Sequence, residues 1–372
     1  MTKILFVTTE DLTGQSGAGV STGEMVRIMA SLADIELSLI APEPSHELGL
    51  PETVETYWLN SKPVGNLRWH LGHQPSMVRA LFCALWNERP EQVLSRVGPS
   101  MLFVPVVQLF PGVEYRALIR GYVHRNLSFQ PLVKAVVWLN ATVATRRYVS
   151  IRGVEDMLRS IGVRGEITFV PNATDPERFK PVAEPTPPEI SSVVADADYV
   201  VGFVGSMKER HLVELLIDAV SQLSESVNVA LVLVGDGPQR AALEELVAKR
   251  NLTNQAVFTG HLPIDQVPAY ITSCDVMYGL SHDSKPSNPI KVYEYLSCGK
   301  PVVTTSTEDL AFVNQKGLGI AIEQNTVDSV HNALQKLYNA GNDRIVEMGR
   351  RGRSHIQDNH SWKYYIRKMT EA

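Results

Sequence analysis

Apolar runs alternate with polar, glycine-rich segments near the start of the chain, and the pattern predicts a strand, a helix and a second strand. Residues 3–8 form a short apolar run, which a loop with three glycines follows. Ser21 and Glu24 have the spacing of a capping box, so a helix is expected to start at Ser21. Apolar residues then recur at helical spacing, and residues 35–41 form the next apolar run. This is a β-loop-α-β unit, the building block of a parallel sheet.

The same alternation is clearer in the second half of the chain. Short apolar runs are separated by loops and by stretches whose apolar residues have helical spacing. This order is typical of a doubly wound α/β domain. The predicted strands are residues 199–204, 229–234, 256–259, 276–280 and 301–304, and the predicted helices include 265–273 and 290–297, the latter ended by Gly299.

Two further segments indicate how the chain is divided. Residues 181–188 (PVAEPTPP) contain four prolines, which exclude a helix or an inner strand and predict a linker. Residues 355–369 carry apolar side chains at helical spacing and predict one closing helix. A chain of 372 residues is too long for one hydrophobic core and suits two domains.

Composition narrows the class of protein. Apolar residues make up 44% and charged residues 20%, as in ordinary globular proteins, and the net charge of −5 argues against a nucleic-acid partner. The longest apolar stretches, such as residues 101–107, are far shorter than the roughly 20 residues of a spanning helix. The start of the chain shows no signal-peptide pattern. Cys83, Cys274 and Cys298 are widely spaced, which argues against disulfides or a zinc ribbon. We therefore expect a cytoplasmic protein.

Loops after the predicted strands of the second half carry groups suited to an anionic ligand. Ligands of open parallel sheets bind beyond the carboxyl ends of the strands, at loops that lead into helix N-termini. The candidates in three of these loops are Gly205, Ser206, Lys208 and His211, then Gly235, and then His261 and Leu262.

The fourth loop, residues 284–294, is the most informative. Asn288 or Ser287 can serve as N-cap and Pro289 fits the first helical position. The backbone N–H groups of Ile290 and Lys291 would then point outward. A helix N-terminus with a lysine beside it is a site for a diphosphate.

Glu294 lies about one helical turn after Lys291. Its carboxylate could accept hydrogen bonds from both hydroxyls of a ribose, and the alternative is a solvated helix residue. The flanking motifs favour the ribose contact.

These motifs, taken in order, resemble a known family. The second half is similar to the donor domain of GT-B glycosyltransferases of the retaining kind grouped as glycosyltransferase family 4. The resemblance is strong over residues 171–305, moderate over 1–44 and hardly visible over 58–150. The matching runs are 170–175 (VPNATD), 203–206 (FVGS), 233–238 (LVGDGP), 258–260 (FTG) and 289–303 (PIKVYEYLSCGKPVV).

The resemblance implies two Rossmann-like, doubly wound domains that face an interdomain cleft, with the C-terminal helix crossing back to the first domain. Residues 1–178, completed by 356–372, would form the acceptor side, and residues 179–355 the nucleotide-sugar side. The implied reaction moves a hexose-like sugar, with retention, from a UDP-, GDP- or dTDP-sugar to a hydroxyl acceptor. That acceptor would be a polysaccharide, a lipid-linked glycan or a small-molecule glycoside. No cofactor and no metal site are implied.

The resemblance also assigns roles to residues. Lys208, Lys291 and Glu294 are the expected catalytic residues, and the two lysines would stabilise the leaving diphosphate. The loop of Gly17, Ala18 and Gly19 would lie on the acceptor side. The expected donor-binding residues are Gly205, Ser206, His211, Gly235, His261, Leu262, Asn288, Pro289 and Ile290.

Two departures from the family pattern keep other functions open. Pro286 stands where the family has a glutamate ahead of Glu294, and Ser206 and His211 stand where it usually has an arginine and a lysine. Lys208 would then take over the contact with the diphosphate. The alternatives are a GT-B homologue that binds a nucleotide sugar with little or no catalysis, and a GT-B epimerase or phosphorylase.

Residues 115–152 contain seven arginines and lysines and no acid, with aromatic residues between them. Arg116 and Arg120 would share a face if this segment were helical. The stretch suggests an anionic partner through Arg116, Arg120, Arg146 and Arg147: a membrane surface touched peripherally, a lipid-pyrophosphate acceptor or an anionic glycan. The alternative is a solvated face paired with acids elsewhere. The oligomeric state is expected to be monomer or homodimer.

Overall fold

The chain forms two compact units in a computed structural model. Unit 1 comprises Met1–Pro171 and Trp362–Ala372, and unit 2 comprises Asn172–Ser361. These bounds differ from those expected, because residues 172–178 and 356–361 belong to unit 2. The segment 181–188, which was predicted to be a linker, also lies within unit 2. The structure describes residues 1–13, 17–45, 47–59, 72, 74–120, 130–183, 186–282 and 288–371.

Unit 1 contains a parallel sheet of seven strands in the order β3-β2-β1-β4-β5-β6-β7. The order reverses between β1 and β4, which is the topological switch point of a doubly wound sheet. The strands are β1 (Thr2–Val7), β2 (Ile35–Pro42), β3 (Glu55–Leu59), β4 (Gln92–Arg96), β5 (Glu114–Ile119), β6 (Arg146–Val149) and β7 (Thr168–Phe169).

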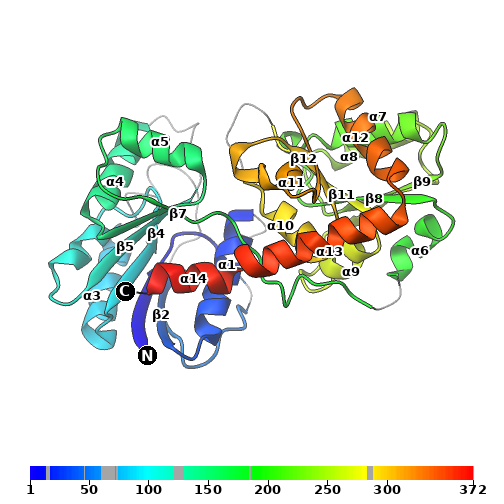
Figure 1. The fold of residues 1–372 in the computed structure, drawn as a ribbon. Coiled ribbons are helices and arrows are strands. Elements are labelled where there is room, and N and C mark those ends of the chain that lie inside the picture. The colour runs from blue at the N-terminus through cyan, green and yellow to red at the C-terminus, as the bar shows by residue number, and fades with distance from the viewer. Residues whose placement is uncertain are drawn as a thin grey trace. The chain divides into compact units, whose positions relative to one another are not determined.

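Helices cover both faces of this sheet. Leu5 and Val7 of β1 point into a core shared with α3, α4, α5 and the short 3₁₀ helix η1. Ile4 and Phe6 alternate with them and are buried on the other face. Figure 1 shows α1 and α14 on the side of the sheet away from α3 and α4. The bounds are α1 (Gly17–Ser31), α3 (Gln74–Glu88), η1 (Val104–Leu109), α4 (Gln130–Val143), α5 (Arg152–Ser160) and α14 (Trp362–Thr370).

Unit 2 contains a second parallel sheet of six strands in the order β10-β9-β8-β11-β12-β13. Here the order reverses between β8 and β11, and apolar cores lie on both faces. The predicted doubly wound α/β fold is confirmed. The strands are β8 (Tyr199–Val204), β9 (Val229–Val234), β10 (Ala256–Gly260), β11 (Val276–Gly279), β12 (Val302–Thr305) and β13 (Gly319–Ile322).

The helices of unit 2 fall into two groups. Helices α7, α8 and α12 contribute to one core, and α6, α9 and α10 to the other. Their bounds, with the remaining helical segments, are α6 (Pro188–Val194), η2 (Glu209–His211), α7 (Val213–Leu223), α8 (Arg240–Lys249), α9 (Val267–Thr272), α10 (Ile290–Ser297), η3 (Glu308–Leu310), α11 (Phe312–Gln315), α12 (Val327–Asn339) and α13 (Asn342–Asn359).

Three local expectations were wrong. Helix α1 begins at Gly17 and not at Ser21, whose hydroxyl donates to Ala18 O (3.2 Å) inside the helix instead of capping it. Helix α10 begins at Ile290, so Pro289 occupies the cap position and not the first helical one. The single closing helix is in fact two, α13 and α14, with Trp362 starting the second.

Candidate functional site

The switch point of the unit 2 sheet brings two of the expected loops together. Gly205 follows β8, and the segment that leads into α10 follows β11, the strand beside β8. Tyr295 of α10 joins the two elements, since its hydroxyl accepts from Val204 N (2.8 Å) and donates to Val204 O (3.0 Å). The carboxyl end of β8 and the start of α10 are therefore held in one place, where ligands of such sheets bind.

Glycine is required where these loops meet. Gly205 and Gly235 have φ of 146° and 121°, a region that side chains rarely adopt. A Cβ on Gly235 would lie 2.1 Å from the carbonyl oxygen of Gly205, and a Cβ on Gly205 would lie 2.6 Å from Lys291 Nζ. The two backbones thus pack directly on each other, with the ammonium group of Lys291 against Gly205.

Lys291 is the most unusual charge of this site. Its side chain is 8% exposed, and its ammonium lies 4.0 Å from the centre of the Phe203 ring. Lys291 Nζ has no hydrogen-bond partner among the residues that the structure describes. Burial lowers its pKa to about 7, against the opposing effect of the Glu294 charge and with a further lowering by Arg210.

Glu294 and Asn288, both expected in the site, are buried on and beside α10. Glu294 is 7% exposed, and its negative charge acts on Lys291. The side chain of Asn288 accepts a hydrogen bond from Tyr293 Oη (2.8 Å), and its backbone carbonyl accepts one from Asn172 Nδ2. Asn288 thus anchors the segment in front of α10 instead of capping the helix with its side chain.

His211 is fixed in one tautomer by its two neighbours. Its Nδ1 faces the carbonyl of Ser206 and must donate to it, while Nε2 accepts from Arg210 Nε (3.2 Å). Burial, and next to it the charge of Lys291, lower the pKa of His211 to about 3. His211 is therefore neutral at physiological pH, and it holds the glycine loop in shape instead of adding a cation.

Other expected residues are less engaged. Lys208 and His261 are exposed, and Leu262 packs against the core behind α9. Gly235 makes a backbone contact, donating to Gly260 O (2.9 Å). Pro286, the position of the missing family glutamate, lies outside the described residues, as do the rest of 283–287.

Phe203, Arg210 and Tyr295 were missed by the sequence analysis. Phe203 and Tyr295 are fully buried and follow the strand and helix periods, so the pattern of the chain shows them only as core residues. Arg210 lies in the glycine loop among other charges, and nothing in its spacing separates it from them.

In unit 1, the expected acceptor-side residues Gly17, Ala18 and Gly19 form the first turn of α1 and not a loop. This turn is held by Arg96, at the carboxyl end of β4, which is 7% exposed. Arg96 Nη1 donates to Ala18 O (2.9 Å) and to Thr22 Oγ1, and Arg96 Nη2 lies 3.6 Å from Glu10 Oε1. No pattern in the sequence indicated a role for Arg96.

The expected anionic-partner patch does not exist as one exposed surface. Arg116 lies in β5, not in a helix, and is completely buried. It donates to the backbone carbonyls of Met369 and Glu371 (3.1 Å) and pairs with Glu114 (2.6 Å). The buried arginine is thus used to fix the end of α14.

The other three arginines of that patch are engaged separately. The Arg120 guanidinium lies 4.8 Å from the centre of the Trp362 ring, and burial lowers its pKa to about 9. Arg146 pairs with Glu114 (3.2 Å). Arg147 donates to the carbonyls of Ala141 and Thr142 near the end of α4.

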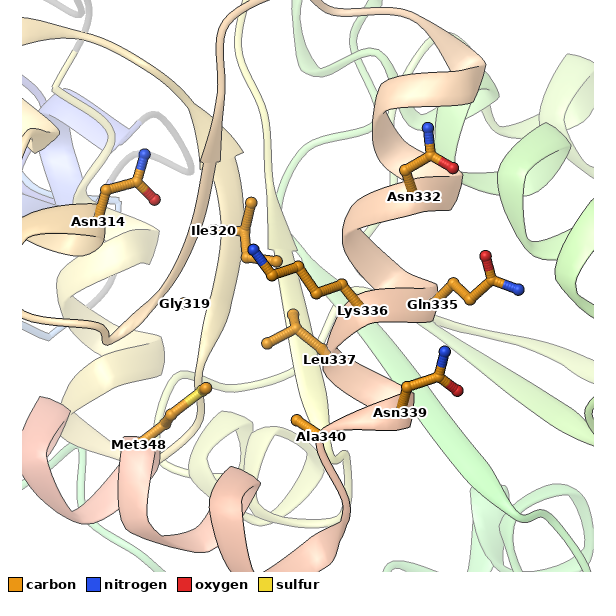
Figure 2. Close-up of a pocket in the computed structure, with 10 residues that line it drawn as sticks. All are labelled: Asn314, Gly319, Ile320, Asn332, Gln335, Lys336, Leu337, Asn339, Ala340 and Met348. Atoms are coloured by element: carbon orange, nitrogen blue, oxygen red, sulfur yellow. The ribbon is translucent and has the colours of Figure 1, made fainter.

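A hollow of about 800 Å³ lies elsewhere on unit 2, between β13 and α12. Figure 2 shows Lys336 extending toward Ile320, whereas Gln335 points away from the strand. The hollow includes none of the residues expected to bind a donor: it is lined by Asn314, Gly319, Ile320, Asn332, Gln335, Lys336, Leu337, Asn339, Ala340 and Met348.

The described residues lack a membrane-spanning helix and a cluster of metal ligands. None of their helices is both long and apolar enough to cross a bilayer. They also contain no cluster of three or more His, Cys, Asp or Glu side chains that could hold a metal ion. The Asp-x-Asp triplet of the chain, Asp196 to Asp198, precedes β8. It therefore lies at the amino end of this strand, whereas Gly205 follows the carboxyl end.

Residues 189–355 match the family model described as glycosyl transferases group 1. A 2-deoxystreptamine glucosyltransferase of Streptomyces kanamyceticus is 32% identical over 195 residues, 48% of this chain and 49% of that protein. A GDP-mannose-dependent α-(1-6)-phosphatidylinositol monomannoside mannosyltransferase of Mycobacterium tuberculosis is 23% identical over 57% of each chain. The chain thus spans about half the length of the curated relatives it matches.

Solved structures agree over nearly the whole chain. A sucrose-phosphate synthase of Thermosynechococcus elongatus superposes with a TM-score of 0.77 at 19% identity, covering 99% of this chain and 97% of that one. HepE of Anabaena, in complex with UDP, gives 0.76 at 15% identity over 100% and 99%. The architecture is the GT-B fold. Over residues 189–355, less than half of its length, the chain is thus similar to the glycosyl transferases group 1 family.

Proposed function

We propose that the chain is a glycosyltransferase that moves a hexose-like sugar from a nucleoside-diphosphate donor to a hydroxyl acceptor. Relatives named as a glucosyltransferase and a mannosyltransferase support the reaction class. HepE, which shares the fold, is solved with UDP and with UDP-glucose. The observation that carries the proposal is the buried Lys291 ammonium, which lies against Gly205 at the switch point of the unit 2 sheet.

The donor diphosphate is the proposed partner of Lys291. A buried ammonium is costly unless an opposite charge or hydrogen bonds accompany it. No described residue accepts a hydrogen bond from Lys291 Nζ, and burial lowers its pKa to about 7. A bound diphosphate would raise that pKa, and the same free energy would appear as affinity for the nucleotide.

The start of α10 and Glu294 are the proposed sites for the rest of the nucleotide. The first N–H groups of a helix have no partner within the helix, and the helix dipole favours an anion there. Ile290 and Lys291 begin α10, and Glu294 follows within the next turn. We assign the ribose hydroxyls to the Glu294 carboxylate, because that group can accept two hydrogen bonds at once.

In the proposed reaction, the bond between the anomeric carbon and the β-phosphate oxygen breaks and its electron pair stays on the phosphate. The acceptor oxygen bonds to the anomeric carbon from the same face, so configuration is retained, and its proton passes to the departing phosphate oxygen. Preorganised cations stabilise the charge that develops there. Lys291 is the main one, and the exposed Lys208 is the second.

We propose that these cations, and not a divalent ion, neutralise the leaving group, and that no cofactor is used. The chemistry of the donor set supports this, because an ammonium and a helix N-terminus bind phosphate directly. Turnover that persists in excess chelator supports this part of the proposal. Turnover that disappears and returns with Mg²⁺ or Mn²⁺ contradicts it.

A thermal-shift titration with UDP-, GDP- and dTDP-sugars tests donor binding, because a ligand that binds only the folded state raises the melting temperature. We expect nucleotide sugars with one of the three nucleobases to raise the melting temperature. Lys291→Met and Glu294→Gln should abolish this rise. Lys249→Met and Glu245→Gln, at exposed positions of α8, serve as controls. A protein that no nucleotide sugar stabilises contradicts the proposal.

Product analysis separates transfer from mere binding. The nucleoside diphosphate should be released either by hydrolysis, when the donor is given alone, or by transfer, when a candidate polysaccharide, lipid-linked or small-molecule acceptor is added. Nucleotide binding without any turnover favours a non-catalytic GT-B homologue. A donor sugar whose configuration changes while the nucleotide stays attached favours an epimerase.

A further inference from the structure

Helices α3 and α4 and the segment between β4 and β5 turn large apolar side chains toward solvent. Trp86 is 81% exposed and Leu109 79%. We call this set the aromatic face: Phe82, Trp86, Phe103, Leu109, Leu132 and Trp138. Single exposed apolar residues are normal, but a group of this size on neighbouring elements is typical of an interaction surface.

The elements that carry the aromatic face form one layer of unit 1. The inner sides of α3, η1 and α4 share one apolar core over the sheet, so their outer sides point the same way. The rings of Phe82 and Phe110 are in edge contact at 5.9 Å, which joins α3 to the segment after η1. Figure 1 shows this layer on the side of the sheet away from α1 and α14.

Polar side chains fix the segment that displays Phe103 and Leu109. Gln74 of α3 donates to Ser100 O (3.0 Å), and Asn140 of α4 donates to Met101 O (2.9 Å). At its other end, Gln108 accepts from Tyr115 N (3.2 Å). The exposed side chains are therefore presented on a segment that is already ordered, which reduces the entropy cost of docking.

The charges on these elements have one sign. Arg79 and Lys134 are exposed on α3 and α4, and Arg89 is exposed just after α3. Among the described residues of α3, α4 and 103–112, the one acid is Glu88, which is half-buried and accepts a hydrogen bond from Tyr57 Oη. The surface is thus both aromatic and cationic.

We propose that the aromatic face docks unit 1 on the surface of an anionic lipid bilayer. Trp and Phe side chains partition into the interfacial region of a bilayer, and nearby Lys and Arg are attracted by anionic headgroups. A second copy of the chain fits less well. In a two-fold contact the same face meets itself, so Arg79 and Lys134 would approach their own copies with no exposed acid of the face to pair with them.

The test is co-sedimentation of the full chain with vesicles of phosphatidylcholine, with and without phosphatidylglycerol. We expect binding to the anionic vesicles, weakened by salt, and lost in the double variant Trp86→Ser/Leu109→Ser. The variant Arg79→Gln/Lys134→Gln should bind about 25-fold more weakly, at about fivefold per charge. Val346→Ser/Tyr364→Ser, which changes exposed apolar residues outside the face, should bind as the unmodified chain does.

Tryptophan fluorescence provides a second readout that does not depend on turnover. The chain has five tryptophans, of which Trp86 and Trp138 are exposed on the aromatic face. Quenching by brominated lipids should therefore be lower in Trp86→Phe/Trp138→Phe than in the unmodified chain. Absence of vesicle binding, or binding that the Trp86/Leu109 variant retains, overturns the proposal. A dimer in sedimentation velocity that this variant dissociates would also overturn it and assign the face to a second copy.

Discussion

Each of the two sheets has a buried cation at the point where its strand order reverses. In unit 1 this is Arg96, at the carboxyl end of β4 beside β1, and in unit 2 it is Lys291, whose ammonium lies against Gly205 after β8. Both side chains are less than one-tenth exposed. The two cations occupy equivalent places in their sheets, but the groups around each charge differ.

Arg96 has its partners within the protein. Its guanidinium is shared among Ala18 O, Thr22 Oγ1 and the nearby Glu10 carboxylate. Lys291 has an aromatic ring at 4.0 Å and no hydrogen-bond acceptor among the described residues. Because a buried charge needs compensation, the first cation stabilises the fold, and we propose that the second is completed by the donor diphosphate.

Replacing Lys291 should give the largest effect on activity. Lys291→Met keeps the volume and removes the charge, so we expect kcat/KM to fall about 100- to 1,000-fold, as for loss of a preorganised donor to a leaving group. The same change removes a buried ammonium group that has no hydrogen-bond partner among the described residues, so the free energy of unfolding should rise by about 1–2 kcal/mol. Steady-state kinetics and urea unfolding measure the two quantities. A variant that is both active and less stable would show that Lys291 is structural.

Replacing Arg96 should lower the stability of the protein and leave its nucleotide affinity unchanged. Arg96→Met removes the hydrogen bonds that the buried guanidinium donates to Ala18 O and Thr22 Oγ1, and we expect the free energy of unfolding to fall by about 3 kcal/mol. Nucleotide affinity of the folded variant should not change. Arg146→Met, which removes an exposed ion pair with Glu114, is the control and should cost less than about 1 kcal/mol. Loss of nucleotide binding in folded Arg96→Met would contradict a purely structural role of Arg96.

The pH dependence of donor affinity sharpens the comparison further. Lys291 has a pKa of about 7 in the free protein, and a bound diphosphate would raise it, so binding takes up a proton above pH 7. Affinity for a nucleotide sugar should therefore be constant below pH 7 and fall by at most about tenfold per pH unit above it. A nucleotide sugar suits this titration, because it lacks the phosphate monoester that ionises near pH 6.

The stability of the free protein should rise with pH over the range in which the donor affinity falls. The unfolded chain binds more protons at Lys291 between pH 7 and 10.5, so this group makes the folded state more stable as pH rises through that window. Isothermal titration of the unmodified protein measures the affinity across the range, and urea unfolding of the unmodified protein and of Lys291→Met measures the stability over the same range. The same pH slope in Lys291→Met would assign it to another group.

The sequence predicted unit 2 well, because its signals are local. The bounds of β8, β9 and α10 coincide with the predicted ones, since apolar runs of strand length end at glycine loops. The φ of 74° at Gly299 confirms its expected place just after α10. Lys291 and Glu294 could be chosen as candidates because the start of one helix carries both of them.

Unit 1 was harder to predict because its decisive contacts are distant in sequence. Arg116 sits fully buried in a strand, since it binds the carbonyl of Met369, 253 residues away. A cluster of arginines therefore suggested a cationic surface where the structure has separate side chains, each in contact with a different part of unit 1. Arg96 was missed for a similar reason: Ala18 and Thr22, its partners, are 78 and 74 residues away.

The smallest expected effect concerns Lys208, the cation that the sequence placed beside Lys291 and that the structure leaves exposed. An exposed charge is screened by water and salt, so its attraction to a diphosphate is weak compared with that of a buried one. Lys208→Ala should lower kcat/KM about fivefold, with the free energy of unfolding unchanged within about 0.5 kcal/mol. Raising the salt concentration should reduce the difference between Lys208→Ala and the unmodified protein, while the defect of Lys291→Met persists. A loss in Lys208→Ala as large as that in Lys291→Met would mean that the loop after β8 closes over the donor and buries Lys208 when substrate binds.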